Sequence, residues 1–180
     1  MGAAGDFAMR GPRLHNLSIL LVDDNAFMLR LLQNLCRGLG IIRILQAETG
    51  EQAIHLLADK QIDLLITDWH MEPMDGLELV HHVRNSPASQ NPYLPIIMLS
   101  GHGDREHVCK ARDAGVNMFM AKPVSAKAMY ERLVWMVNNP LPFIRSGGYF
   151  GPDRRHRDLG PPDGIAERRA GRVEEARATA

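Results

Sequence analysis

The segment Leu64-Leu65-Ile66-Thr67-Asp68 decides the fold class of this chain. Its first four residues suit the interior of a sheet, and a bare carboxylate follows them. Parallel strands that are covered on both faces are near-continuous apolar runs, and ligands of such sheets bind beyond the carboxyl ends of the strands. The segment therefore predicts a buried strand whose end opens into a functional site, with Asp68 as the first candidate residue.

Three other apolar runs end in the same way. The runs and the polar residues that follow them are 19–22 with Asp23 and Asp24, 96–99 with Ser100, and 118–121 with Lys122. The carboxyl ends of parallel strands meet at one edge of a sheet. We therefore expect three acids, a hydroxyl and an amine to gather at that edge.

Helical patterns alternate with these strands. Apolar residues recur at helical spacing over 28–39, 48–58, 77–85, 104–114 and 125–137, and a further strand-like segment covers 42–47. Five strands that alternate with five helices predict an α/β fold: a doubly wound, five-stranded parallel sheet with right-handed crossovers and helices on both faces.

Composition limits the alternatives. The chain has 180 residues, 45% of them hydrophobic, which is enough for one core and one domain with tails. Its formal net charge of +0 gives no reason to expect direct DNA binding or attachment to a membrane surface. No run approaches the ~18 apolar residues of a membrane span. Cys36 and Cys109 lack the spacing of metal or redox motifs, so we expect reduced thiols in a cytoplasmic protein.

The domain boundaries follow from a change in composition. Residues 1–13 are rich in Gly and Ala and are expected to form a disordered leader, and residues 14–139 form the domain. From Pro140 onward the chain is rich in Arg, Gly and Pro and has few large aliphatic side chains. We expect residues 140–180 to be a tail of low order, because such a composition buries too little apolar surface. Residues 142–145 and 149–155 mix aromatic residues with arginine, so a binding peptide or a strap over the domain stays open as an alternative.

The three acids make the functional edge a candidate cation site. Two unit charges about 4 Å apart repel by roughly 4 kcal/mol at an effective dielectric constant of 20. A hard divalent cation relieves this repulsion, and Mg²⁺ prefers oxygen ligands with several waters retained. We expect Asp24 and Asp68 to bind Mg²⁺ directly and Asp23 to bind it through a water molecule. The backbone carbonyl of His70 would complete the set.

The same groups suit phosphoryl transfer. Mg²⁺ and Lys122 would neutralise charge on the transferring phosphoryl group and leave Asp68 as the nucleophile. Ser100 would donate a hydrogen bond to a phosphoryl oxygen. Simpler readings stay open: Asp23 or Asp24 as the N-cap of the following helix, Ser100 as a strand end, and Lys122 as a solvated turn lysine.

Four segments resemble the receiver domain of the response regulators of two-component signalling. They are L-V-D-D-N (21–25), I-T-D-W-H-M-E-P-M-D-G (66–76), I-M-L-S-G (97–101) and F-M-A-K-P (119–123). Their order, spacing and strand context agree. The resemblance implies the flavodoxin-like receiver fold, of the stand-alone type that chemotaxis regulators have.

The resemblance also implies residue roles and partners. It makes Asp68 the phosphoacceptor and Lys122 the phosphoryl-binding amine. Asp23 and Asp24 become acids of the metal site, Ser100 the switch hydroxyl, and Phe119 the switch aromatic. The implied phosphoryl donor is a histidine kinase or a histidine phosphotransfer protein. The output protein is not identified by the sequence.

One segment departs from the family pattern. Family members commonly have proline directly after the methionine that follows the phosphoacceptor, whereas Glu72 stands there in this chain and Pro73 follows it. The spacing from Asp68 to Gly76 is unchanged. We therefore expect a re-set loop backbone and an intact site.

Three classes of function fit these residues. The leading one is a phosphoacceptor signalling protein that changes its partner-binding surface. The second is an adaptor that uses the same fold without phosphorylation, which the complete set of acids, hydroxyl and lysine argues against. The third is a phosphohydrolase with an aspartyl nucleophile. Such enzymes typically need an acid two residues past the nucleophile, where this chain has His70.

Candidate partner surfaces lie on the first and last helices. Asn25 and Leu29 are one turn apart near the functional edge, and we expect them on the exposed side of the first helix, where a phosphohistidine-bearing helix would dock. A flank of the core is the alternative for Leu29. Trp135 lies off the apolar stripe of the last helix, which suggests a docking patch, a homodimer through the last two helices, or packing under the tail.

Overall fold

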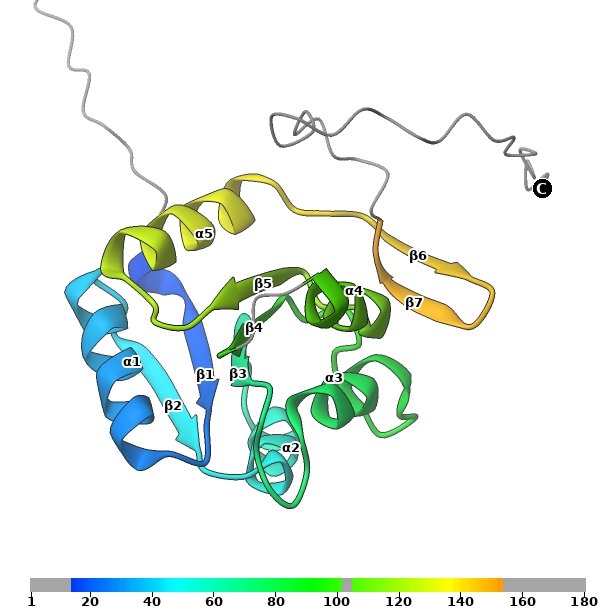
Figure 1. The fold of residues 1–180 in the computed structure, drawn as a ribbon, viewed down its shortest axis with the longest axis horizontal. Helices are drawn as coiled ribbons and strands as arrows, with labels where there is room; N and C mark the ends of the chain where they lie inside the picture. Colours follow the sequence, from blue (N-terminus) through cyan, green and yellow to red (C-terminus); the bar gives the residue numbers. More distant parts are fainter. Residues whose placement is uncertain (1–13, 102–104, 154–180) are drawn as a thin grey trace, which may run out of the picture.

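The predicted five-stranded parallel sheet is confirmed. The computed structural model describes residues 14–101 and 105–153. The strands are β1 (Ser18–Val22), β2 (Arg43–Ala47), β3 (Leu64–Asp68), β4 (Ile96–Ser100) and β5 (Met118–Ala121), after a short 3-10 turn at Leu14–Asn16. They pair in parallel in the order β2-β1-β3-β4-β5 (Figure 1).

Helices cover both faces of the sheet. They are α1 (Ala26–Gly38), α2 (Gly50–Asp59), α3 (Gly76–Asn85), α4 (Arg105–Ala114) and α5 (Ala126–Asn138). The buried residues form two clusters, one on each face. One cluster takes its helical members from α1 and α5, and the other takes them from α2, α3 and α4. None of the helices in the described ranges has the length and apolar character needed to cross a bilayer.

The strand order places a switch point between β1 and β3. From β1 the chain crosses outward to β2, then returns to the other side of β1 to form β3. The crossovers on either side of this point run in opposite directions, which leaves a crevice at the carboxyl ends of the strands. Asp23 directly follows β1 and Asp68 ends β3. The topology therefore brings the two acids to the two sides of the crevice.

Side-chain caps begin four of the helices. Asn25, Thr49, Asp75 and Ser125 each accept a hydrogen bond from a backbone amide in the first turn of the helix that follows. Asp75 and Glu78 form a reciprocal capping box on α3. The N-cap of α1 is Asn25, so the alternative reading of Asp23 or Asp24 as that cap is wrong. Both acids precede the cap and stay at the sheet edge.

The prediction of an exposed Leu29 is wrong. Leu29 is 2% exposed and packs beside Leu32 and Cys36, whereas Leu31, which fits the apolar stripe equally well, is 45% exposed. Leucines occur almost all round α1, so periodicity alone cannot decide which arc faces the sheet. Leu29, Leu32 and Cys36 are the buried residues of α1 and define its inner arc.

The prediction that low order begins at Pro140 is also wrong for residues 143–152. These residues form an antiparallel hairpin of β6 (Phe143–Ser146) and β7 (Tyr149–Pro152), drawn in orange in Figure 1. The two-residue turn consists of Gly147 and Gly148, with φ of 54° and 82°. Two-residue hairpin turns of type I′ need positive φ at both central positions, which glycine adopts without steric cost. The predicted leader and the rest of the tail lie outside the described residues.

Candidate functional site

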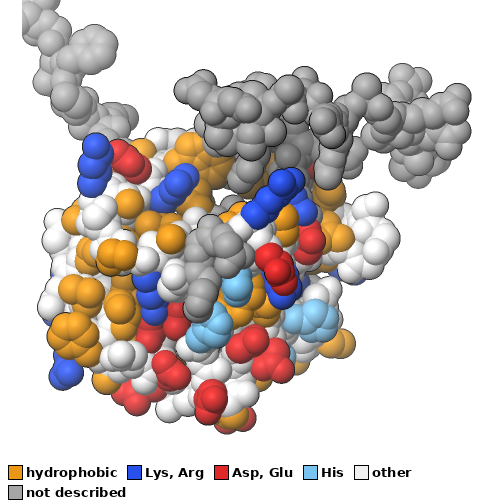
Figure 2. Space-filling view, viewed as in Figure 1, with side chains coloured by type: hydrophobic (Ala, Val, Ile, Leu, Met, Phe, Trp, Pro, Cys, Tyr) orange, Lys and Arg blue, Asp and Glu red, His pale blue; other side chains and the backbone are white. Residues whose placement is uncertain are grey.

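The three predicted acids meet at the carboxyl edge of the sheet. Asp23, Asp24 and Asp68 each offer a carboxylate oxygen, and these oxygens lie within 4.8 Å of one another. Figure 2 shows acidic side chains gathered on the lower part of the molecule, toward which the arrowheads of β1 and β2 point in Figure 1. Asp23 and Asp68 are buried, whereas Asp24 is exposed.

Strand alternation explains why Asp23, Asp68 and Lys122 lie on one face of the sheet. Side chains two apart along a strand point to the same side of a sheet. Asp23, Asp68 and Lys122 each come two residues after a core residue on the α1 and α5 face: Leu21, Ile66 and Met120. The register of the sheet therefore aims two acids and the amine at the same point.

Lys122 connects two of the acids. Its Nζ lies 2.9 Å from Asp23 Oδ2 and 3.0 Å from Asp68 Oδ1. Burial alone lowers the pKa of Lys122, but hydrogen bonds and charge from Asp23 and Asp68 outweigh burial and raise the pKa above its usual value. Lys122 is therefore firmly protonated at neutral pH. The alternative of a solvated turn lysine is wrong.

At Asp68, in contrast to Lys122, burial decides the direction of the pKa shift. It raises the pKa of this carboxyl above its ordinary value, and the neighbouring charge of Asp23 acts in the same direction. The hydrogen bond and the charge of Lys122 lower the pKa and offset part of this rise. A partly desolvated carboxylate beside two other acids is a favourable place for a further cation.

The donor set fits a hard divalent cation. Asp24 is exposed and presents its carboxylate to solvent. Asp23 is occupied on both oxygens, because Oδ2 accepts from Lys122 and Oδ1 accepts from the amide of Asn25 at 2.9 Å. This agrees with the expectation that Asp23 acts through water. Direct ligation by Asp24 and Asp68, and by the carbonyl of His70, stays a prediction.

The loop after Asp68 closes through Gly76, which the sequence analysis did not single out as a site residue. The amide of Gly76 donates to the carbonyl of Trp69 at 2.8 Å, and the amide of Trp69 donates to Leu99 of β4 at 2.9 Å. A Cβ on Gly76 would collide with the backbone carbonyl of Asp68. The signal that was available is the fixed spacing between Asp68 and Gly76. The peptide bonds Glu72–Pro73 and Lys122–Pro123 are cis.

Ser100 and Phe119 lie on the opposite face of the sheet from Lys122. Met98 pairs with Phe119 across β4 and β5, and Ser100 lies two residues beyond Met98, so both candidates point toward α2, α3 and α4. Ser100 is fully buried at the end of β4. The ring of Phe119 is half-buried and meets the ring of Trp69 edge-on, at 6.4 Å between centroids.

Comparison with known proteins assigns the family. Residues 19–134 match the model of the response regulator receiver domain. The chain belongs to this family. Its members are signalling proteins rather than enzymes in the usual sense, and the resemblance seen in the four sequence segments is thereby confirmed.

Named relatives of the receiver include chemotaxis proteins. It is 35% identical over 118 residues to chemotaxis protein CheY-3 of Vibrio cholerae serotype O1, which covers 66% of this chain and 89% of that protein. It is 38% identical to chemotaxis protein CheY1 of Helicobacter pylori, over 65% of this chain and 94% of the relative. A crystal structure of a response regulator receiver protein from Pseudomonas putida superimposes with a TM-score of 0.58 at 33% identity, covering 65% and 94% of the two chains.

The receiver also carries an aromatic contact that the sequence analysis missed. His107 of α4 meets the ring of Trp69 edge-on at 5.0 Å between centroids, and it lies 6.4 Å from the ring of His70. Trp69 is buried directly after Asp68. α4 is therefore in contact with the residue next to the candidate phosphoacceptor. His102, another histidine near this edge in the sequence, lies outside the described residues.

The candidate partner surfaces are partly revised. The exposed apolar residues on α1 are Phe27, which is 66% exposed, and Leu31. Asn25 is exposed as expected but serves as the helix cap. Trp135 is half-buried, and the exposed aromatic residue of α5 is Tyr130. A docking or homodimer surface at Trp135 stays a prediction.

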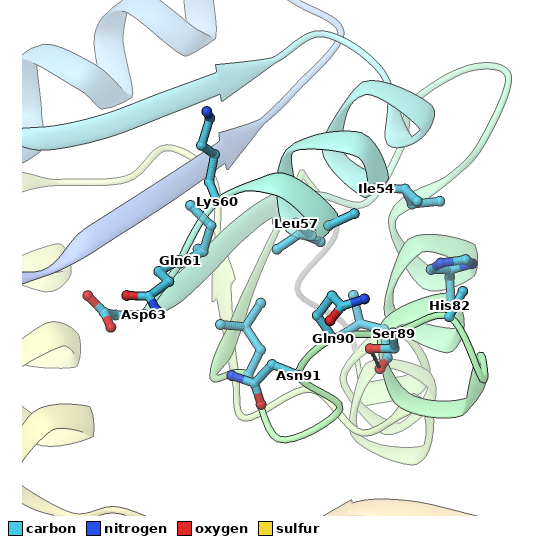
Figure 3. Close-up of a pocket in the computed structure, with 14 residues that line it drawn as sticks. Ile54, Leu57, Lys60, Gln61, Asp63, His82, Ser89, Gln90 and Asn91 are labelled. Carbon is cyan, nitrogen blue, oxygen red and sulfur yellow. Dashed lines mark hydrogen bonds between the residues drawn. The ribbon is translucent and has the colours of Figure 1, made fainter.

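A cavity of about 420 Å³ lies near the amino ends of β3 and β4, away from the acidic cluster. It lies between the end of α2, the loop before β3 and the connection from α3 to β4 (Figure 3). Two of its polar groups already serve the fold: Asp63 accepts from the amide of Ser18, and Ser89 donates to the carbonyl of Val83. The cavity is separate from the acidic cluster, since none of the three acids lines it.

The Gly76 contact gives a testable prediction for the site. Gly76→Ala should lower the free energy of unfolding by about 1–3 kcal/mol, because the added methyl group overpacks against the backbone at Asp68. Gly38→Ala is the matched control: a Cβ at Gly38 meets nothing within 4 Å, so stability should be unchanged or slightly increased. Urea unfolding measures both. Equal stability of the two variants would contradict the assigned role of Gly76.

Proposed function

We propose that the protein is a single-domain response regulator that accepts a phosphoryl group on Asp68 in a Mg²⁺-dependent reaction. The donor would be a histidine kinase or a histidine phosphotransfer protein in the cytoplasm. The observation that supports this most directly is the Lys122 ammonium between the carboxylates of Asp23 and Asp68, with Asp24 beside them.

The residues suit the transfer step. A carboxylate oxygen of Asp68 attacks phosphorus, a P–O bond forms, and the P–N bond to the donor imidazole breaks. Lys122, which starts at 3.0 Å from Asp68, can then turn its ammonium to a phosphoryl oxygen. Mg²⁺ held by Asp24 and Asp68 would neutralise part of the charge on the equatorial oxygens. Asp23 and Asp68 are buried, and the lower local dielectric constant there strengthens the interaction of Lys122 with charge on Asp68.

Two other functions fit less well. An adaptor without phosphorylation has no need to keep a lysine and three carboxylates together, since the repulsion among the acids costs stability. A phosphohydrolase with an aspartyl nucleophile typically needs a second carboxylic acid two residues past that nucleophile. The residue two positions past Asp68 is His70, and its side chain is exposed.

Intact mass after incubation with Mg²⁺ and acetyl phosphate separates the three functions. We expect one labile phosphoryl group on the wild type. Asp68→Asn has nearly the same volume but removes the nucleophilic charge, so uptake should vanish while the circular dichroism spectrum stays unchanged. An unlabelled wild type would favour the adaptor, and multiple turnover of phosphoesters would favour the hydrolase. Labelling of the variant at another residue would show that Asp68 is not the acceptor.

The signal would leave the site through Ser100 and Phe119. Phosphorylated Asp68 would draw the hydroxyl of Ser100 inward, and the half-buried ring of Phe119 on the same face could fill the space behind it. Lys122 would hold the phosphoryl group in place. A two-state shift of this kind changes partner affinity by about 1–3 kcal/mol.

Substitutions should separate phosphorylation from the switch. Ser100→Ala and Phe119→Ala should still take up one phosphoryl group but lose most of the phosphorylation-dependent change in partner affinity or dimerisation. Lys122→Ala should weaken the same coupling more than it weakens Mg²⁺ binding, because Lys122 is not among the proposed ligands. Titration calorimetry with and without acetyl phosphate measures both. A wild-type response in all three variants would mean that the signal takes another route.

Phe27 and Leu31 replace Leu29 in the proposed docking surface for the phosphoryl donor. They are exposed one turn apart on α1, which begins directly after the acidic edge. Phe27→Ala should slow phosphoryl transfer from a histidine kinase that labels the wild type, because an apolar anchor is lost. Labelling by acetyl phosphate should be unchanged. Leu29→Ala is unsuitable as a probe since it opens the core. Equal slowing with both donors would place the effect in the site itself.

A further inference from the structure

A buried arginine organises the end of the domain opposite the acids. Arg84 of α3 is 2% exposed, and its guanidinium donates to the carbonyls of Pro92 and Gly115 and to Asn117 Oδ1, at 2.7, 3.0 and 3.0 Å. These acceptors lie in the connections before β4 and β5. Burial lowers the pKa of Arg84 to about 10, so the group is charged at neutral pH. Arg84 therefore ties α3 to two neighbouring connections.

The β6–β7 hairpin covers this arginine. The ring of Phe143 stacks on the guanidinium, with 5.0 Å from Arg84 Cζ to the ring centroid. Phe143, Phe150 and Tyr93 form a cluster with centroids 5.3 to 5.7 Å apart. The guanidinium of Arg145 lies 4.6 Å from the ring of Phe150. The hairpin is thus docked on the domain by aromatic and cation–π contacts.

Backbone contacts between glycines bring the hairpin against the end of α4. β7 packs on both α3 and α4. A Cβ at Gly151 would lie 2.8 Å from the Cα of Gly115, and a Cβ at Gly115 would lie 2.8 Å from the carbonyl oxygen of Phe150. Gly115 has a φ of 96°, and it follows the last residue of α4. Only glycine permits this approach at either position.

α4 is the helix with the fewest buried residues among the five. Ala111 is its single buried residue, so the helix buries little apolar surface of its own. Elements of this kind open at low free energy. One end of α4 touches the hairpin through Gly115, and toward the other end His107 contacts Trp69, the residue after Asp68. α4 therefore spans the distance between the hairpin and the acidic site.

We propose that the β6–β7 hairpin is a clasp that holds α4 in place, and that its docking is coupled through α4 to the occupancy of the acidic site. The clasp itself follows from the contacts around Gly115, Phe143 and Arg84. The coupling to phosphorylation rests on the function proposed above. The hairpin lies after residue 134, where the match to the receiver family ends.

The coupling works in both directions. If a ligand at Asp68 shifts Trp69 and α4, it changes the free energy of hairpin docking, and release of the hairpin changes ligand affinity by the same factor. The clasp would therefore set how readily α4 moves on activation. A receiver without it would have a more mobile α4 in both states.

Hydrogen exchange on the full-length protein tests the clasp. Gly151→Ala inserts a methyl group between β7 and Gly115, and Phe143→Ala removes the ring on Arg84; both sites lie outside the receiver core. Ser146→Ala, on the exposed end of β6, is the matched control. Amides of residues 105–114 should exchange about five-fold faster or more in both clasp variants and at the wild-type rate in the control. Unchanged exchange in α4 of both clasp variants would overturn the proposal.

A second measurement tests the coupling. Exchange is measured in wild type and Gly151→Ala with Mg²⁺, before and after acetyl phosphate, and intact mass records the phosphoryl uptake. Phosphorylation should change exchange in residues 143–152 of the wild type. If the protein is labelled and neither the hairpin nor α4 responds, the coupling is wrong. If no phosphoryl group is taken up, the proposed function fails, and with it the coupling, whereas the clasp is still judged by the first measurement.

Discussion

The ammonium group of Lys122 and the carboxylates of Asp23 and Asp68 form the interaction on which the functional edge depends. Two buried acids at the ends of neighbouring strands repel each other, and the cost at about 4 Å is roughly 4 kcal/mol at an effective dielectric constant of 20. Lys122 offsets this cost by lying within 3.0 Å of both. Because the Lys122 ammonium group already holds the two carboxylates in place, the site can accept a further charged group with little reorganisation.

The sheet gives this interaction its geometry. Asp23, Asp68 and Lys122 come from three different strand ends, and each is set on the same face by the two-residue period of its strand. A shift of one residue in the register of β5 would turn Lys122 to the other face. The site is therefore as rigid as the central sheet, whose residues in β3 and β4 are all buried.

α4 and the hairpin extend the domain beyond this rigid centre. The central strands are packed on both sides, whereas α4 has one buried residue and also contacts Trp69 and the hairpin toward its two ends. A rigid site beside a weakly held helix is an arrangement in which a small change at the site can alter a larger surface. The hairpin adds contacts to the end of that helix through β7 and Gly115.

The sequence by itself determined the five strands, the five helices and the residues of the functional edge, because buried parallel strands have continuous apolar runs whose polar ends are easily recognised. It did not determine which arc of α1 faces the sheet, since leucines surround that helix and only packing selects Leu29 over Leu31. The Gly147-Gly148 pair is typical of a hairpin turn, but the Arg-, Gly- and Pro-rich composition of the surrounding tail favoured low order, so the hairpin was not predicted. The contact between Gly115 and Gly151 was decided by the tertiary structure alone, because a close backbone approach joins segments that are distant in the chain and leaves no local pattern.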